Sequence, residues 1–185
     1  MGIGSIEALL ELRTTSVAGT HAVAAAIAAL ARPGDLLVLA GEMGAGKTAF
    51  AQGFGRALGI TEPITSPTFT LVHSYDSGRV MLHHADLYRL ERMTEVADLA
   101  LGELLEDHAV VLVEWGDVVA NTLGSHLEVR LLHLDVDDVD DVDDAGVDGA
   151  DDASRAIELR PVGRQWSSRW ERLEADLGEW RVPAC

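Results

Sequence analysis

Residues 41–48, Gly-Glu-Met-Gly-Ala-Gly-Lys-Thr, constrain the fold of this chain most strongly, because they match the phosphate-binding pattern G-x-x-x-x-G-K-[ST] without a mismatch. The apolar run at 36–40 before them is typical of a strand that is buried on both faces. A helical pattern follows from Thr48 to Leu58, and Gly59 stands where a C-terminal helix cap is expected. Strand, glycine-rich loop and helix in this order distinguish the segment from a chance glycine-rich turn, and they predict a nucleotide-binding α/β unit.

The residue types of this loop suit the binding of a triphosphate. Glycines let successive backbone N–H groups point at phosphate oxygens, and the helix N-terminus adds a partial positive charge. Lys47 is expected to reach the β- and γ-phosphates, and the Thr48 hydroxyl is expected to ligate Mg²⁺. The residues expected to contact the nucleotide in this segment are Glu42, Met43, Gly44, Ala45, Gly46, Lys47 and Thr48.

An acidic group at the end of a neighbouring strand should complete the magnesium site. Glu114 follows four apolar residues, which is the pattern of a Walker B strand. Asp86 follows another expected strand and could reach the same crevice at the carboxyl ends of the strands. The sequence leaves open which carboxylate contacts the metal. His83 and His84 share the strand before Asp86, so their side chains point to opposite faces and at most one faces the crevice.

Hydroxyl groups cluster between the loop and the next strand. The segment 63–68 is expected to be irregular, because its prolines and β-branched residues disfavour a helix. Thr65, Ser66 and Thr68 stand where nucleotide switches place a hydroxyl on the γ-phosphate or the metal. Turn formation is the alternative role for the same residues.

The remaining patterns predict an α/β, P-loop NTPase-like fold of three layers, with a central, mainly parallel sheet and an antiparallel C-terminal hairpin. Ser16 should cap a helix that ends before Pro33. Alternation at 126–134 and 155–160 predicts the hairpin. The other expected elements are strands at 69–75, 80–84 and 109–113, a helix at 94–107 and an amphipathic terminal helix with apolar residues at 166, 170, 173, 177 and 180. Residues 1–162 would form the P-loop domain, and residues 163–185 would form a C-terminal helix followed by a tail. The tryptophans of this helix are expected to pack inward.

The charge of the chain limits its partners. The formal net charge is −17, and ten aspartates with no Lys or Arg lie within 135–152. A protein of this balance is not expected to hold a nucleic acid backbone by itself. The aspartate tract lacks the spacing of a calcium-binding EF-hand and is expected to form a disordered, solvated loop.

The chain is expected to work in the cytoplasm and away from membranes. Cys185 is the only cysteine, which fits a reducing compartment. No apolar run approaches the length of about 20 residues that spans a bilayer, and the N-terminus does not have the pattern of a secretory leader.

Four segments in this order resemble the bacterial TsaE family of P-loop ATPases, which takes part in making threonylcarbamoyladenosine in tRNA. They are 41–48, Ser-Pro-Thr-Phe-Thr-Leu-Val at 66–72, His-Ala-Asp-Leu-Tyr-Arg-Leu at 84–90 and Val-Glu-Trp at 113–115. The P-loop alone is common to many proteins, so the other three segments make the resemblance specific. It covers roughly residues 16–160.

The resemblance implies that the chain binds Mg²⁺-ATP and hydrolyses ATP slowly. It implies that Thr48 and Glu114 bind the metal. It also implies a switch-like loop at 66–68, with Thr68 and Lys47 among the catalytic residues, and a requirement for Asp86 in turnover.

The same resemblance implies where the base and the partner proteins lie. Adenine would lie between the N-terminal segment and the C-terminal hairpin, which points to Thr20 and to Arg155, whose guanidinium could stack on a base. Trp115 would flank the nucleotide or the partner surface. Family members work with the TsaB and TsaD proteins, so tRNA would be met only through them. Ala85, where the family usually has an aromatic residue, and the long aspartate tract are departures from the family pattern.

Two other functions are compatible with a P-loop. A small-molecule kinase is the first alternative, although no arginine-rich lid is found between the core strands, where Arg79, Arg89 and Arg92 are scattered. A GTP switch is the second, but the guanine-binding tetrad N-K-x-D does not occur, and 121–124 does not match it.

Overall fold

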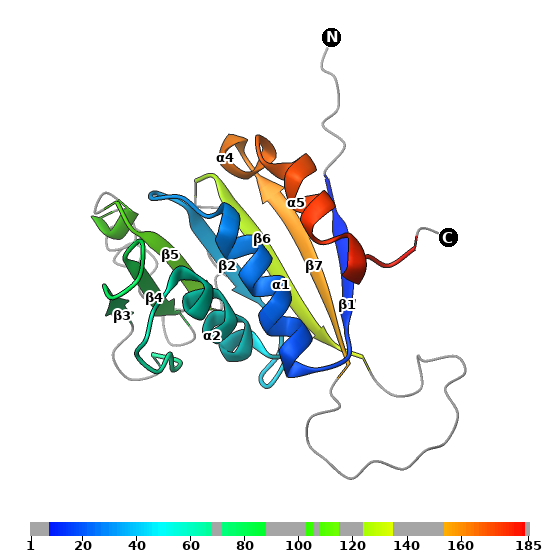
Figure 1. Cartoon of the computed structure of the whole chain (residues 1–185), viewed down its shortest axis with the longest axis horizontal. Coiled ribbons are helices and arrows are strands. Elements are labelled where there is room, and N and C mark those ends of the chain that lie inside the picture. The colour runs from blue at the N-terminus through cyan, green and yellow to red at the C-terminus, as the bar shows by residue number, and fades with distance from the viewer. Residues whose placement is uncertain are drawn as a thin grey trace.

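One sheet of seven strands runs through the part of the chain that the structure describes, in the order β1-β7-β6-β2-β5-β4-β3 (Figure 1). The structure is a computed structural model that describes residues 8–67, 72–87, 103–105, 108–114, 124–134 and 154–183. The strands are β1 (Leu10–Thr14), β2 (Leu36–Ala40), β3 (Val72–Tyr75), β4 (Leu82–Asp86), β5 (Val110–Glu114), β6 (His126–His133) and β7 (Arg155–Val162). The helices are α1 (Val17–Leu30), α2 (Lys47–Leu58), α4 (Arg164–Ser167) and α5 (Trp170–Asp176), followed by the 3-10 turn η3 (Gly178–Trp180).

The four central strands, β6, β2, β5 and β4, run parallel to one another. The hairpin of β6 and β7 is antiparallel and pairs His126 with Val162 at one end and His133 with Arg155 at the other. The expected mainly parallel sheet with an antiparallel C-terminal hairpin is therefore confirmed. Every residue of β2 and β5 is buried, as expected for central parallel strands that are covered on both faces.

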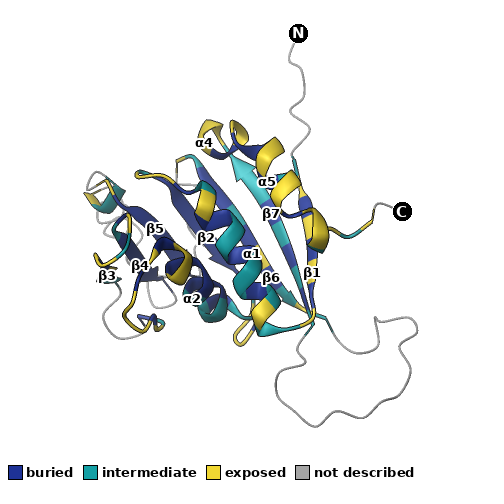
Figure 2. Cartoon of the chain, in the orientation of Figure 1, coloured by how far each residue is buried: buried dark blue, intermediate teal, exposed yellow. Residues whose placement is uncertain are grey.

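The central strands pack into two hydrophobic clusters on opposite faces of the sheet. On one face, α1 and α2 lie across the strands (Figure 1), and the burial of the strands beneath them is visible in Figure 2. This cluster includes Leu37, Leu39, Leu82, Leu112, Phe50 and Phe54. The opposite cluster is formed by Leu36, Val38, Ala85, Leu87, Val111 and Val113, with Leu104 and Leu105 packed against it. Of the helix expected at 94–107, the structure describes only 103–105, and these residues are helical.

The helix predicted after residue 16 is confirmed, including its cap. The Ser16 Oγ accepts a hydrogen bond of 3.1 Å from the Gly19 N–H, which satisfies one of the free donors at the start of α1. Gly59 has a φ of 89° at the end of α2, as expected for a left-handed cap.

β1 is not among the strands predicted from the sequence, although its burial alternates with a period of two. Leu10, Leu12 and Thr14 are buried, and Glu11 and Arg13 between them are exposed. β1 lies at the edge of the sheet and pairs along its length with β7, which lies far along the chain, while Leu12 also forms a single bridge with Arg181. A short strand of this kind is stabilised by its pairing partner, so its own sequence carries a weak signal.

The prediction of a single terminal helix over 166–180 is wrong, because the structure divides this segment into α4, α5 and η3. The Ser167 and Ser168 hydroxyls donate to the carbonyl oxygens of Gly163 and Gln165, at 2.6 and 2.9 Å. Such side-chain bonds compete with helix continuation, and Arg169 leaves helical geometry at ψ 3°. The expected packing role of the tryptophans is confirmed for Trp166, which is fully buried in the main core.

A buried ion pair joins this C-terminal segment to the start of the sheet. The Arg169 guanidinium donates to both carboxylate oxygens of Asp35, at 2.6 and 2.7 Å, and to the Leu30 carbonyl at 2.6 Å. Its carbon Cζ lies 4.2 Å from the centre of the Trp166 ring. The pair fixes α5 against the turn between α1 and β2.

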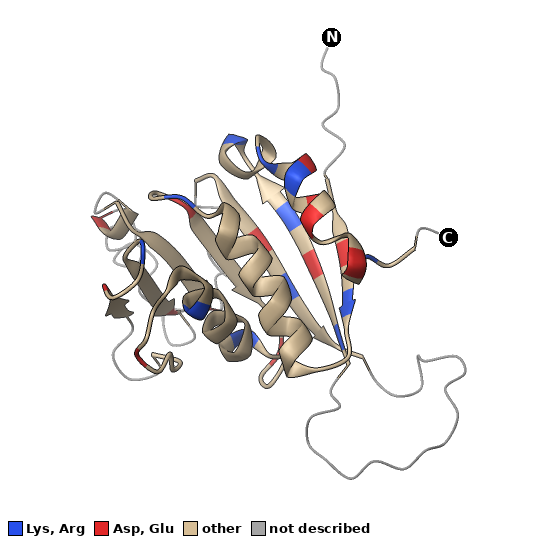
Figure 3. Cartoon of the chain, in the orientation of Figure 1, with Lys and Arg blue, Asp and Glu red and all other residues tan. Residues whose placement is uncertain are grey.

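Charged residues of both signs occur along β6 and β7 (Figure 3). Glu128 faces Arg160 across the hairpin, and Arg130 faces Glu158, with 4.0 Å between Arg130 Nε and Glu158 Oε2. This mixed surface is not a continuous basic patch. The helices of the described ranges are all too short or too polar to cross a membrane.

Candidate nucleotide-binding site

The phosphate-binding loop connects β2 to α2, as the sequence predicts. Gly46 lies just before α2 with a φ of 105°, and no side chain caps the first turn of the helix. A Cβ atom at Gly41 would overlap the carbonyl oxygen of Leu131 on β6, so only glycine allows this close approach. The uncapped N–H groups of the first turn are therefore suited to an external anion such as a phosphate.

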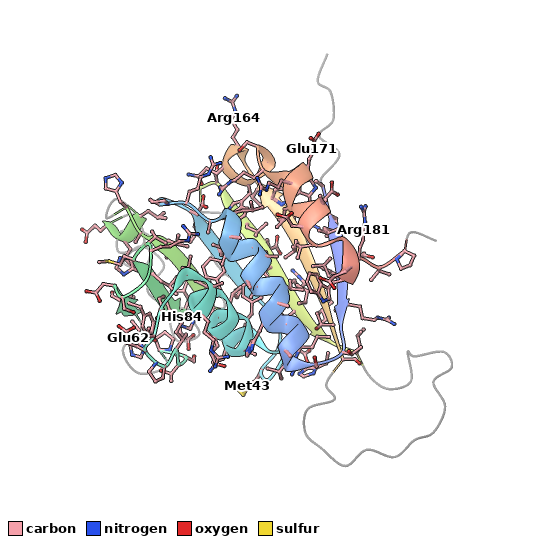
Figure 4. All side chains as sticks on the ribbon, in the orientation of Figure 1. Met43, Glu62, His84, Arg164, Glu171 and Arg181 are labelled. Atoms are coloured by element: carbon pink, nitrogen blue, oxygen red, sulfur yellow. The ribbon has the colours of Figure 1, made fainter. Side chains whose placement is uncertain are left out.

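Lys47 lies across the loop from which it comes. Its Nζ donates to the carbonyl oxygens of Gly41 and Glu42, at 2.7 and 2.8 Å, and the side chain is buried. Met43 is 74 % exposed and reaches the edge of the molecule (Figure 4). Thr48 is half-buried in the first turn of α2, directly after Lys47. The positively charged ammonium group of Lys47 thus lies at the loop, where the negative charge of the phosphates is expected.

Arg155, at the start of β7, packs against the same loop. Its Nε donates to the Ala45 carbonyl at 3.1 Å, and it lies 2.7 Å from the position that a Cβ atom at Gly46 would take. A residue larger than glycine at position 46 would displace this guanidinium. The structure thus brings Arg155 to the phosphate-binding loop across 110 residues of sequence.

Thr20 lies close to this region but is fully buried. Its hydroxyl is 3.2 Å from the Thr14 hydroxyl and donates to the Ser16 carbonyl at 3.3 Å. Thr14 in turn pairs with Arg155 between β1 and β7. The N-terminal segment and the hairpin therefore meet beside the loop, while the Thr20 side chain itself is engaged inside the fold.

His133 also lies at this site, although it is not among the residues predicted from the sequence. It is exposed at the end of β6, where it pairs with Arg155, and its Nε2 lies 3.7 Å from the position of a Cβ atom at Gly44. The predicted hairpin could have indicated His133, because the residue opposite Arg155 in the hairpin must lie at the same end of the sheet as Arg155.

Asp86 and Glu114 lie side by side at the carboxyl ends of β4 and β5. They are direct register partners, and Glu114 also pairs with Leu39, two residues before the phosphate-binding loop. Both side chains are buried. They extend the row that contains Leu82 and Leu112, whose side chains pack with α2, so the two carboxylates face the helix that carries Thr48.

Each carboxylate has a hydrogen-bond partner. The Glu114 Oε1 lies 2.9 Å from His84 Nε2, and both side chains are buried. The Asp86 Oδ2 accepts a bond of 3.3 Å from the Ser66 hydroxyl, which joins it to the segment with the hydroxyl cluster. The backbone N–H of Leu87 donates to the Glu114 carbonyl at 3.1 Å.

The two histidines of β4 point to opposite faces, as expected. His83 Nδ1 lies 2.8 Å from the Ser74 hydroxyl on β3, whereas His84 contacts Glu114. At most one of them was expected to face the crevice, and the structure identifies it as His84.

The arrangement fits a magnesium ion of the kind found beside a P-loop. No group of three or more His, Cys, Asp or Glu side chains able to hold a metal ion occurs within the described ranges. A P-loop site needs fewer protein ligands, because phosphate oxygens and water complete the octahedron. Thr48 with Glu114 or Asp86 supplies the required oxygen chemistry. Thr68, Trp115 and the aspartate tract at 135–152 lie outside the described residues.

Comparison with known proteins gives one consistent result. The family model described as threonylcarbamoyl adenosine biosynthesis protein TsaE matches residues 14–151. The Bacillus subtilis protein named tRNA threonylcarbamoyladenosine biosynthesis protein TsaE is 45 % identical over 114 residues, which are 62 % of this chain and 71 % of that protein. The protein of the same name from Nostoc is 42 % identical over 106 residues, 55 % of this chain and 65 % of that protein.

A solved structure agrees with these relatives. The crystal structure of Bacillus subtilis YdiB matches with a TM-score of 0.68 and 32 % identity, over 95 % of this chain and 98 % of that one. The sheet order, the phosphate-binding loop and the match to the family model over most of the chain lead to the same conclusion. The chain belongs to the TsaE family and has a P-loop NTPase-like α/β fold.

Proposed function

We propose that the protein is a magnesium-dependent, ATP-binding and ATP-hydrolysing subunit of the system that makes threonylcarbamoyladenosine in tRNA, and that it acts with the TsaB and TsaD proteins. The observation that carries this proposal is the position of the Asp86 and Glu114 pair beside the phosphate-binding loop. Membership of the TsaE family supports the pathway.

ATP would bind with its phosphates at the first turn of α2. Lys47 would exchange its contacts with the Gly41 and Glu42 carbonyls for β- and γ-phosphate oxygens, because a bond between two charged groups is stronger than a bond from the ammonium to a neutral carbonyl. Mg²⁺, held by Thr48 and Glu114, would offset negative charge on the phosphates. Arg155 and Thr20 remain the proposed neighbours of adenine. Arg155 packs against the phosphate-binding loop, and Thr20 lies beside Thr14, the register partner of Arg155.

Asp86 would connect the nucleotide site with the switch-like segment at 66–68. Its contact with the Ser66 hydroxyl gives this segment a direct link to the carboxylate that is expected to support turnover. Thr68 is the further catalytic residue proposed for the same segment. A change in the phosphates could therefore be transmitted to a surface that partner proteins recognise.

The charge of the chain supports a role within a complex. Its net charge is −17, and the surface of β6 and β7 mixes acids with bases. Such a surface offers little affinity for tRNA by itself, because affinity for nucleic acid comes largely from neutralising phosphates. TsaB and TsaD would hold the tRNA, and the reaction would take place in the cytoplasm.

The test is ATP hydrolysis by the purified protein with and without TsaB and TsaD, followed by co-purification of those proteins in the presence and absence of ATP. We expect Lys47→Ala to lower turnover by about 10²–10³-fold, since it removes a preorganised positive charge from the phosphates. Arg172→Ala is the matched control, because that side chain is 75 % exposed on α5. Unchanged hydrolysis in Lys47→Ala would exclude the assigned site.

Transfer of phosphate to a metabolite would favour the kinase instead, and preference for GTP in competition would favour a switch.

A further inference from the structure

His84 is fully buried on β4, yet its ring has one polar contact in the described structure. The Nε2 atom lies 2.9 Å from Glu114 Oε1, and Nδ1 has no hydrogen-bond partner among the described residues. His84 lies within the outline of the molecule, whereas Met43 and Glu62 reach its edge (Figure 4). Because a carboxylate only accepts hydrogen bonds, we expect Nε2 to carry the proton and donate it to Glu114.

The neighbours of His84 do not require a histidine for packing. The side chain before it on the same face is Leu82, and its register partner on β5 is Leu112. A buried imidazole with one unpaired nitrogen is less favourable at such a position than an apolar side chain of similar volume. What the imidazole adds is a fixed donor to Glu114.

A fixed donor has a clear consequence for the carboxylate. Without it, the Glu114 side chain could turn about its rotatable bonds, and one oxygen would lose its partner in a buried position. Residues that orient a metal-binding carboxylate in this way contribute to metal affinity although they do not contact the ion.

We propose that His84 is a positioning residue that holds the Glu114 carboxylate in the orientation that binds Mg²⁺. This inference rests on the proposed function, because it assigns a role toward the proposed metal ligand. It differs from a packing role in one respect, since it depends on the Nε2 donor and not on the volume of the ring.

Three substitutions separate the donor from the volume. His84→Leu removes the donor. His84→Gln retains it, because the Gln amide nitrogen lies as many bonds from Cα as histidine Nε2. His84→Asn keeps an amide but places its nitrogen at the position of Nδ1, too short to reach Glu114. His83→Leu is the matched control, since His83 lies on the opposite face and contacts Ser74.

The measurement is the Mg²⁺ concentration needed for tight binding of a fluorescent ATP analogue, with binding in EDTA and thermal unfolding recorded on the same samples. We expect His84→Leu and His84→Asn to need about 10- to 100-fold more Mg²⁺. His84→Gln and His83→Leu should stay near the wild-type value. Binding of the analogue in EDTA should be equal in all variants, because the phosphate-binding loop is intact.

A second readout needs no metal or nucleotide. In the metal-free protein, the imidazole ¹⁵N signals of His84, assigned by their loss in His84→Gln, should show the tautomer with the proton on Nε2. A proton on Nδ1 alone would overturn the inference. Equal Mg²⁺ requirements in His84→Leu, His84→Gln and the wild type would also overturn it and would leave a packing role. Wild-type protein that binds the analogue without any effect of Mg²⁺ would instead contradict the proposed function.

Discussion

Asp86 and Glu114 are register partners on neighbouring parallel strands, and their side chains share the face of the sheet that carries α2. Each is held by a different neighbour, Asp86 by the Ser66 hydroxyl and Glu114 by His84. A cation beside two neighbouring carboxylates would offset the repulsion between their negative charges. Their hydrogen bonds also suggest different tasks, because one leads to the segment at 66–68 and the other leads into the core.

The different environments predict a division of roles between the two acids. We expect Glu114→Gln to weaken Mg²⁺-dependent nucleotide binding by roughly 10- to 100-fold, since it removes a charged metal ligand while keeping the hydrogen bond to His84. Asp86→Asn should leave this binding near normal and lower turnover. Magnesium titration of nucleotide binding and single-turnover hydrolysis measure the two effects separately. A normal magnesium titration in Glu114→Gln together with weakened Mg²⁺-dependent binding in Asp86→Asn would assign the role of metal ligand to Asp86.

Replacing Gly46 should disrupt the phosphate-binding loop. Gly46→Ala combines a φ of 105° with a new methyl group 2.7 Å from Arg155 Nε. We expect about a tenfold or larger loss of nucleotide affinity, because strain of about 1–2 kcal/mol corresponds to such a factor. Gly34→Ala is the control, since its φ is 87° and nothing lies within 4 Å of the added atom. It should destabilise the protein slightly and bind nucleotide normally. Equal binding by both variants would contradict the close approach of Arg155 to the loop.

The buried pair of Arg169 and Asp35 should contribute strongly to stability. We expect Arg169→Ala to lower the free energy of unfolding by about 3–5 kcal/mol, because it leaves the Asp35 carboxylate buried without its cation. The exposed pair of Arg172 and Asp176 is the control, and Arg172→Ala should change the free energy by less than about 0.5 kcal/mol. Urea unfolding of the three proteins tests this. Similar midpoints for Arg169→Ala and Arg172→Ala would show that α5 docks without the ion pair.

Stability should fall in mild acid, in part through His21. Burial, and secondly the positive charge of Arg56, lower the pKa of His21 below its ordinary value of 6.5. The unfolded chain therefore takes up this proton before the folded one, so the contribution of His21 is present above about pH 6.5 and is lost as the pH falls below it. The change in melting temperature between about pH 7.5 and about pH 5.5 should be smaller in His21→Gln than in the wild type. An identical change in both proteins would exclude His21 as a source of the acid sensitivity.

Local patterns were sufficient for the central part of the fold. The strand before the phosphate-binding loop, the loop itself and α2 follow from a contiguous apolar run, a glycine pattern and a helical period. The strand that ends at Glu114 is equally local, because both faces of a central parallel strand are buried and the four residues before Glu114 are all apolar. In these segments, neighbours in sequence already decide the backbone geometry.

The phosphate-binding loop, the parallel core and the two carboxylates at its edge could be predicted from sequence, because each depends on residues that are close together in the chain. Four features became visible in the folded protein alone: the strand β1, the break of the terminal helix at Arg169, the contact of Arg155 with Ala45 and the contact of His84 with Glu114. These features depend on strand pairing and on side chains brought together from distant segments. These contacts stabilise the protein only once the sheet has assembled, so no local sequence pattern predicts them.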